Sequence, residues 1–215
     1  MNEDAEKNTN KGRISTIHLG DLKSGKKSGS LSATFEWDDP GGSPMIAESR
    51  SMTFYAEPDR RTIDVDSTFT AKIDLSFNDT KEGFFAIRVA DSMKGDQGGV
   101  VTNSFGAQSE KNVWGQPAEW ADYVGSVEGQ KVGIAIFDHP ANYNHPPRWH
   151  ARAYGLFAVN PFGLKAFDKN APGTGGYKMK AGQSIRFRWR VIVHSGDVPP
   201  QQVSNWYTEY KKKAK

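Results

Sequence analysis

The sequence predicts an all-β protein, an antiparallel β-sandwich with one short C-terminal helix. Apolar and polar residues alternate in several stretches, which is the pattern of half-buried strands. Turn-forming Gly and Pro residues separate these stretches along the whole chain of 215 residues. Hydrophobic residues make up 36% of the chain, which suffices for one packed core and excludes global disorder.

Three alternating stretches predict the most regular strands. Residues 62–77 place a mostly apolar set, from Ile63 to Phe77, on one face. Residues 31–37 and 185–193 repeat the pattern, and the second of these carries Arg186, Arg188 and Arg190 on its polar face. An arginine face either pairs with carboxylates on the next strand or binds an acidic ligand, and pairing is favoured.

Other stretches predict buried strands and the helix. Residues 83–90 and 132–137 are apolar on both faces, which is typical of central strands, and residues 149–159 predict one more strand. After two prolines, four residues follow the i, i+3, i+4, i+7 pattern of an amphipathic helix. We expect this helix to dock its aromatic stripe on the sandwich; the stripe comprises Val203, Trp206, Tyr207 and Tyr210.

Composition limits the organisation and the partners. We expect a disordered polar tail at residues 1–12, the β-sandwich at 13–198, and the helix with a basic tail at 199–215. Four of the last five residues are lysine, so the net charge of +3 belongs to the tail and predicts no nucleic-acid partner. No apolar stretch predicts a membrane span or a signal peptide, so the chain is expected to be soluble, with its location open. The absence of Cys excludes disulfides and thiolate metal sites.

Candidate chemistry is concentrated in residues 138–163, with the sequence DHPANYNHPPRWHARAYGLFAVNPFG. His139 and His145 each precede a proline, which disfavours helical geometry, and the spacing of His145 and His150 excludes a helical zinc motif. A loop-borne divalent metal site of His139, His145 and His150 stays open as an alternative. No other cofactor is expected, because glycine-rich phosphate-binding motifs are absent from the sequence.

The strand at 149–159 suggests how this chemistry is arranged. If it is fully extended, His150, Arg152 and Tyr154 share one face with a spacing of about 7 Å. Such a row can bind an anionic or polyhydroxylated ligand, or it can be an ordinary polar sheet face. Glu82 and Arg88 are expected on one face of the strand at 83–90, as a buried pair or as part of a site.

A family resemblance covers roughly residues 13–210. Residues 114–163 resemble the signature of a bacterial family of unknown function whose members have been labelled "methane oxygenase PmoA", as do KEGFFAIRVAD and KAGQSIRFRWRVIVHSGD. The signature positions are Glu82, Arg88, Trp114, His139, Asn142, His145, Trp149, His150, Arg152, Tyr154, Asn160 and Phe162.

The resemblance implies an all-β fold and a place among bacterial carbohydrate-degradation genes. Methane monooxygenase activity is not expected, because the subunit of that enzyme is a membrane protein and this chain shows no membrane span. Family members usually begin with a His-rich segment similar to HPHHRG, and nothing before Arg13 matches it. The resemblance therefore implies a shortened member.

These observations favour a carbohydrate-active protein, an enzyme of hydrolase or lyase type that cleaves or modifies a sugar or an acidic glycan. His145 or His150 would be the general acid or base, Tyr154 its proton partner and Arg152 the anchor. The other expected binding residues are Arg88, Glu82, Trp149, Trp114, Asn142 and Asn160. The alternatives are a non-catalytic carbohydrate-binding or structural module and a His-ligated metal protein. The expected partner is a carbohydrate or small molecule, and the oligomeric state is open.

Overall fold

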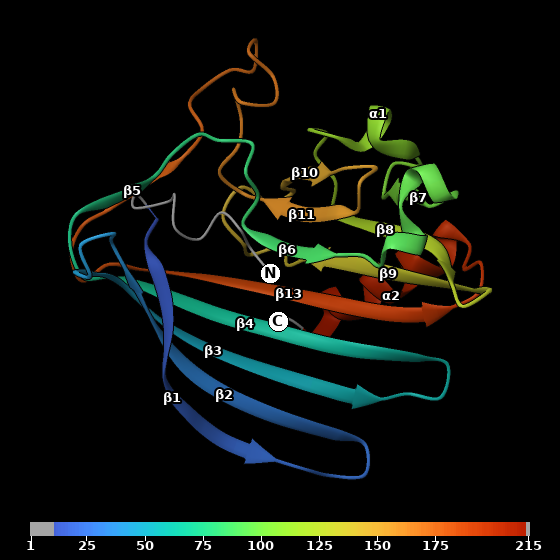
Figure 1. Ribbon diagram of the computed structural model, residues 1–215, viewed down its shortest axis with the longest axis horizontal. Coiled ribbons are helices and arrows are strands. Elements are labelled where there is room, and N and C mark those ends of the chain that lie inside the picture. Colours follow the sequence, from blue (N-terminus) through green and yellow to red (C-terminus); the bar gives the residue numbers. More distant parts are fainter. Residues whose placement is uncertain (1–10, 214–215) are drawn as a thin grey trace.

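The computed structural model describes residues 11–213, which form mainly antiparallel β-sheet (Figure 1). Eight strands make one large sheet in the order β1 (Arg13–Lys23), β2 (Ser28–Asp38), β3 (Pro44–Ala56), β4 (Arg60–Ala71), β13 (Ser184–Ser195), β9 (Gln130–Asp138), β8 (Trp120–Val127) and β7 (Val100–Asn103). A second sheet has the order β10 (Arg148–Ala151), β11 (Leu156–Asn160) and β6 (Phe85–Arg88). The predicted all-β sandwich is confirmed.

The remaining elements are short apart from the C-terminal helix. Strand β12 (Tyr177–Met179) pairs with β5 (Leu75–Phe77) as a two-stranded sheet. The helices are α1 (Ser109–Val113) and α2 (Pro200–Lys213), and η2 (Asp91–Met93) and η3 (Gly95–Gln97) are single 3-10 turns. No helix within residues 11–213 is long and apolar enough to cross a membrane.

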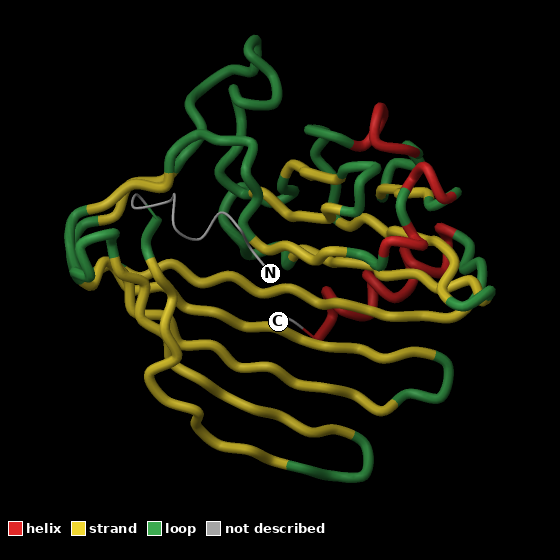
Figure 2. Tube along the Cα trace, in the orientation of Figure 1, coloured by secondary structure: helices red, strands yellow, loops and turns green. Residues whose placement is uncertain are grey.

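The large sheet is covered on both faces where β13, β9 and β8 run through it. On one face the second sheet supplies Trp149 and Phe157 to the main core. On the other face α2 packs its predicted stripe against the sheet, which confirms that expectation; the sheet residues are Trp120, Ala135, Phe137 and Ile192. Figure 2 shows helices around this part of the molecule and none over β1–β3.

The β1–β3 end of the large sheet extends beyond this cover (Figure 1). The edge strand β1 leaves Ile14, Leu19 and Leu22 more than half exposed. Burial is therefore greatest around β13 and β9, and the chain after β9 leads directly from this buried region into the histidine-rich segment.

Two predicted single strands are each two strands. The alternation at 62–77 is interrupted after Ala71, and the chain resumes in β5 in a different sheet, although Leu75 and Phe77 still pack on the core. The stretch at 149–159 is a hairpin in which β10 pairs with β11. Gly155 closes its turn with φ of 95°, and its N–H donates to the Arg152 carbonyl at 3.0 Å. The predicted row of His150, Arg152 and Tyr154 on one strand is therefore wrong.

The two strands predicted to be central have different outcomes. Strand β9 lies between β13 and β8, as predicted for residues 132–137. Strand β6, predicted to be central from residues 83–90, is an edge strand of the second sheet. Glu82 precedes β6, and both Glu82 and Arg88 are exposed, so they do not form a buried pair. Most of the predicted tail at 1–12 lies outside the described residues.

Candidate functional site

Two regions contain most of the polar side chains considered for the site, and the first lies at the β10–β11 turn. We call Arg88, Glu110, Arg152 and Tyr154 the hairpin cluster. Tyr154 is 47% exposed, and the Cζ atoms of Arg88 and Arg152 lie 5.1 and 5.4 Å from its ring centroid. Arg152 Nε is 2.7 Å from Glu110 Oε1, and Arg88 donates to the Tyr154 carbonyl at 3.3 Å. Each arginine thus has a contact within the cluster, although Arg152 Nε makes no regular hydrogen bond with the described residues.

His150 is buried in β10, apart from this cluster. Its side chain is 2% exposed, and neither ring nitrogen has a hydrogen-bond partner among the described residues. The nearest carboxylate is that of Glu82, 4.0 Å from Nδ1, and the Glu82 side chain is itself 68% exposed. Burial lowers the pKa of His150, so the imidazole is neutral near pH 7. It lacks the short hydrogen bond that usually orients a general base.

Three of the predicted binding residues pack against other parts of the protein, Trp149 and Asn160 buried and Trp114 half-buried. Trp149 is fully buried, and its Nε1 donates to the Ala118 carbonyl at 2.9 Å. Trp114 packs edge-on against Phe167, with ring centroids 5.1 Å apart. The Asn160 Oδ1 accepts the backbone N–H groups of positions 162 and 163, and its Nδ2 donates to the carbonyl of position 80. All three hold neighbouring segments in place.

The second region is the histidine loop, residues 138–148, between β9 and β10. It begins at Asp138, the last residue of β9, which is 1% exposed. Asn142 Nδ2 donates to Asp138 Oδ1 at 2.7 Å and to the Arg188 carbonyl at 2.8 Å, and its Oδ1 accepts the Arg188 N–H at 2.9 Å. Asn142, expected to bind substrate, instead attaches the loop to β13.

His145 lies between a carboxylate and a phenol. Its Nδ1 is 2.8 Å from Asp138 Oδ2, and its Nε2 is 3.4 Å from the Tyr207 hydroxyl of α2. A carboxylate accepts hydrogen bonds, so this arrangement puts the proton on Nδ1 and leaves Nε2 as the acceptor. Burial raises the pKa of Tyr207, so the phenol stays protonated. Burial also raises the pKa of Asp138, while its hydrogen bonds with His145 and Asn142 act in the opposite direction.

The structure therefore contains a His–Tyr pair oriented by an acid, but the tyrosine is Tyr207 and not Tyr154. Asp138 is not among the site residues predicted from the sequence, although it stands directly before the first histidine of the motif. Tyr207 was predicted to belong to the packing stripe of the helix, and it does pack there as well. A hydroxyl on a packing stripe gives no sequence signal for a second role.

A pocket of about 270 Å³ adjoins His145. Asn144, Arg148 and Thr174 contribute polar groups to its wall, and four prolines contribute ring surfaces: Pro117, Pro146, Pro147 and Pro161. Arg148 donates one N–H to the Gly115 carbonyl. A guanidinium has five N–H groups, so several of them are available to a ligand.

His139 lines a different cavity, of about 200 Å³, between β4, β13 and Tyr210 of α2. It is 3% exposed, and its Nδ1 accepts the Ala141 N–H at 3.0 Å. Burial and the nearby Arg188 charge lower the pKa of His139 to about 4. Within residues 11–213 no group of three or more His, Asp or Glu side chains is arranged to hold a metal ion, and His139, His145 and His150 have separate surroundings.

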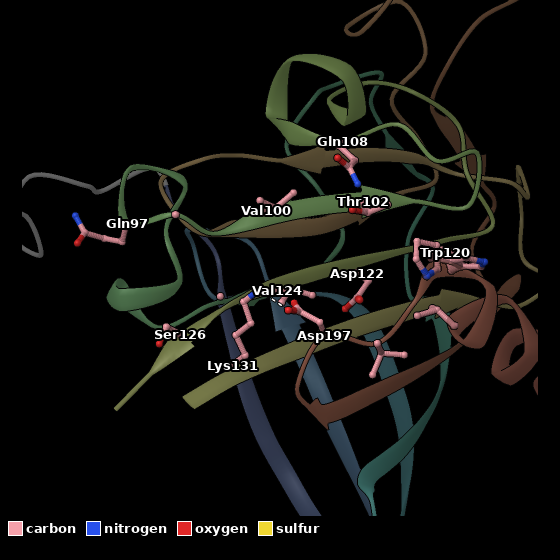
Figure 3. A pocket seen from close by; sticks show the side chains of 15 residues that line it. Gln97, Val100, Thr102, Gln108, Trp120, Asp122, Val124, Ser126, Lys131 and Asp197 are labelled. Carbon is pink, nitrogen blue, oxygen red and sulfur yellow. Dashed lines mark hydrogen bonds and ion pairs between the residues drawn. The ribbon is translucent and has the colours of Figure 1, made fainter. Parts of the chain in front are cut away.

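A larger cavity of about 480 Å³ lies at the β7–β8 end of the sheet, beside the start of α2 (Figure 3). Asp122 in its wall is 3.2 Å from His194, and Lys131 forms an ion pair with Asp197. The charged groups of this wall are therefore paired with each other or with their neighbours. The histidine loop is the stronger candidate site, because its buried Asp138 orients His145, which lines a pocket.

The fold and the loop define an all-β sandwich with a pocket lined by His145, whose ring also contacts the C-terminal helix. The chain belongs to DUF6807, a family of unknown function, whose model matches residues 2–208. No curated protein matches the chain.

Among solved structures the chain is similar to the GH36 alpha-galactosidase AgaA from Geobacillus stearothermophilus, determined as a variant in complex with stachyose. The identity is 12% and the TM-score 0.31, over 86% of this chain and 27% of the other. This chain thus corresponds to about a quarter of that enzyme, and at this TM-score the likeness supports no conclusion about function.

Proposed function

We propose that this protein binds a sugar or an acidic glycan in the pocket beside His145 and modifies it by acid–base chemistry. One observation carries the proposal: His145 lines the pocket and lies between Asp138, at 2.8 Å, and the Tyr207 hydroxyl, at 3.4 Å. Asp138 fixes the tautomer in which His145 Nε2 can accept a proton. Tyr207 takes the role of proton partner that the sequence suggested for Tyr154.

The pocket wall suits a carbohydrate. A sugar ring presents hydroxyl groups at its rim and C–H groups on its faces, and this wall presents proline rings beside Asn144, Arg148 and Thr174. Arg148 takes the anchoring role predicted for Arg152, since a guanidinium can hold a carboxylate through two N–H groups. The resemblance to the PmoA-labelled family supports the same substrate class, because its members often occur among carbohydrate-degradation genes.

A non-catalytic carbohydrate-binding module is the second candidate. It is favoured by the Tyr207 hydroxyl, which already faces the Nε2 atom that a catalytic base would use. In that case the Asp138–His145–Tyr207 hydrogen bonds hold the loop against α2, and the pocket binds a glycan without changing it.

Mass spectrometry of products from a panel of neutral and uronic-acid oligosaccharides separates the two functions. We expect product from the wild type and none from His145→Gln, with thermal unfolding verifying that the variant is folded. His18→Gln is the matched control, because His18 is exposed in β1, and it should retain full activity. Saturable binding without product, equal in wild type and His145→Gln, would favour the module. Product formation by His145→Gln at the wild-type rate would refute the catalytic role.

A further inference from the structure

The polar face between β4 and β13 has one more arginine than it has aspartates. The register places Arg190 opposite Asp64 and Arg188 opposite Asp66. Arg190 follows this register and donates to both Asp64 oxygens, at 2.6 and 2.7 Å. Asp66, however, is bound by Arg186 through Nε, at 2.8 Å, and through Nη2.

Of the three arginines on this face, Arg188 is therefore the one without an aspartate partner. Its side chain makes no ion pair or hydrogen bond with the described residues 11–213, although its backbone is bonded to Asn142. Arg188 is half-buried and lines the 200 Å³ cavity that His139 also lines. A cation held there loses part of its hydration without gaining a counter-ion, so an anion that enters the cavity is favoured.

His139, which lines the same cavity, carries a second donor. Its Nδ1 accepts the Ala141 N–H at 3.0 Å, so the proton of the neutral imidazole is on Nε2. Nε2 is buried and has no hydrogen-bond partner among the described residues. Tyr210 packs edge-to-face on the imidazole, with centroids 5.6 Å apart, and limits its rotation. Buried N–H donors without partners are rare in proteins, and a bound ligand is one common explanation.

We propose that this cavity, lined by Arg188 and His139, binds one carboxylate group of a small organic acid, such as a sugar acid. The Arg188 guanidinium holds both carboxylate oxygens as a fork, and His139 Nε2–H donates to one of them. The three arginines and two aspartates of this face of β4 and β13 leave a single uncompensated positive charge, which matches one carboxylate. A phosphate dianion would exceed that charge and would meet repulsion from Asp64 and Asp66. This cavity is separate from the pocket beside His145, so the inference does not depend on the proposed function.

Isothermal titration calorimetry at constant ionic strength tests the proposal with four probes: sodium acetate, sodium D-glucuronate, D-glucose and inorganic phosphate. We expect saturable binding of at least one of the two carboxylates, weaker binding of phosphate, and none of glucose. Arg188→Gln should weaken carboxylate binding about tenfold or more, because a hydrogen-bonded ion pair is lost. Arg188→Lys keeps the charge without the fork and should give an intermediate affinity.

Two further variants sharpen the test. Asp66→Asn releases Arg186 and leaves two uncompensated arginines, so carboxylate binding should tighten several-fold. Arg61→Gln is the matched control, since it removes one exposed arginine of β4 outside the cavity, and it should leave the affinity unchanged. Thermal unfolding verifies that each variant is folded.

Several results would overturn the proposal. These are the absence of saturable binding by both carboxylates up to roughly 10 mM, equal affinity in wild type and Arg188→Gln, and equal weakening by Arg61→Gln. Phosphate binding as tight as carboxylate binding would overturn the assignment of the ligand class.

Discussion

The hairpin cluster and the histidine loop both contain arginine, carboxylate and tyrosine side chains. The two regions differ in how exposed these side chains are to water and in their hydrogen-bond partners. In the hairpin cluster Tyr154 is 47% exposed, Arg152 pairs with Glu110, and Arg88 bonds a carbonyl. In the loop Asp138 is 1% exposed. There the interior groups form a short chain of hydrogen bonds. Beside the loop, one cavity is lined by Arg188 of β13, which has no ion pair among the described residues, and by His139, whose Nε2 has no hydrogen-bond partner among them.

This difference shows why composition alone misplaces a site. In solvent, arginine, glutamate and tyrosine satisfy each other at little net gain, because water screens their charges. In the interior the same groups interact strongly, and a group without a partner can gain a hydrogen bond or an ion pair from a bound ligand. The location of buried and unsatisfied groups is therefore more informative than the density of polar residues.

The largest expected effect comes from removing one acid in each region. Asp138→Ala leaves His145 and Asn142 without their buried acceptor and should lower the free energy of unfolding by about 3–5 kcal/mol. Glu110→Ala in the hairpin cluster removes a partly exposed ion pair and should lower it by about 1 kcal/mol or less. Urea unfolding measures both, and similar losses for the two variants would contradict the contrast drawn between the regions.

The next effect is a pH dependence caused by His139. Its pKa is about 4 in the folded protein against an ordinary value of 6.5, so between these values the unfolded chain binds more protons. The resulting stability is complete above pH 6.5 and is lost as the pH falls towards 4, by up to about 3 kcal/mol. We expect the unfolding free energies of wild type and His139→Gln to differ in slope over this range.

His18→Gln is the control for this experiment, because His18 is exposed and its variant should follow the wild-type curve. Burial also lowers the pKa of His150, so the wild-type curve alone does not isolate His139. Parallel curves for wild type and His139→Gln would show that His139 does not cause the dependence.

A smaller effect should follow from Asn142→Ala, which removes the hydrogen bonds that attach the histidine loop to Asp138 and to the backbone of β13. We expect a loss of about 2 kcal/mol, since a buried partner group is left unsatisfied. Tyr154→Ala in the hairpin cluster should change the stability by about 0.5 kcal/mol or less, as is usual for exposed positions. If Asn142→Ala is as mild as Tyr154→Ala, the loop is not held by this side chain.

The sequence predicted the parts of the fold that follow simple periodicity. The strands around residues 31–37 and 185–193 and the docking of α2 depend on spacing that one chain segment carries by itself. The hairpin at 149–159 was missed because alternation continues through its turn, and only the backbone conformation at Gly155 reverses the chain.

The site was harder to predict, because it depends on contacts between distant segments. His145 was a candidate from its motif, but its partner Tyr207 is 62 positions away in a helix whose pattern indicates packing. The arginine face of β13 was expected to pair with carboxylates, and Arg186 and Arg190 do so. Arg188 lacks an aspartate partner because Arg186 makes a diagonal contact to Asp66, which no sequence pattern specifies.

The central claim, that ligand binds at the histidine loop and not at the hairpin cluster, is tested most directly by nuclear magnetic resonance. Long-range proton–nitrogen spectra of the imidazoles, with the Arg152 Nε–H as reference, can be followed during titration with uronic-acid oligosaccharides. We predict that the His139 or His145 ring nitrogens shift saturably while the Arg152 signal does not move. A saturable shift at Arg152 with both imidazoles unchanged would contradict the claim.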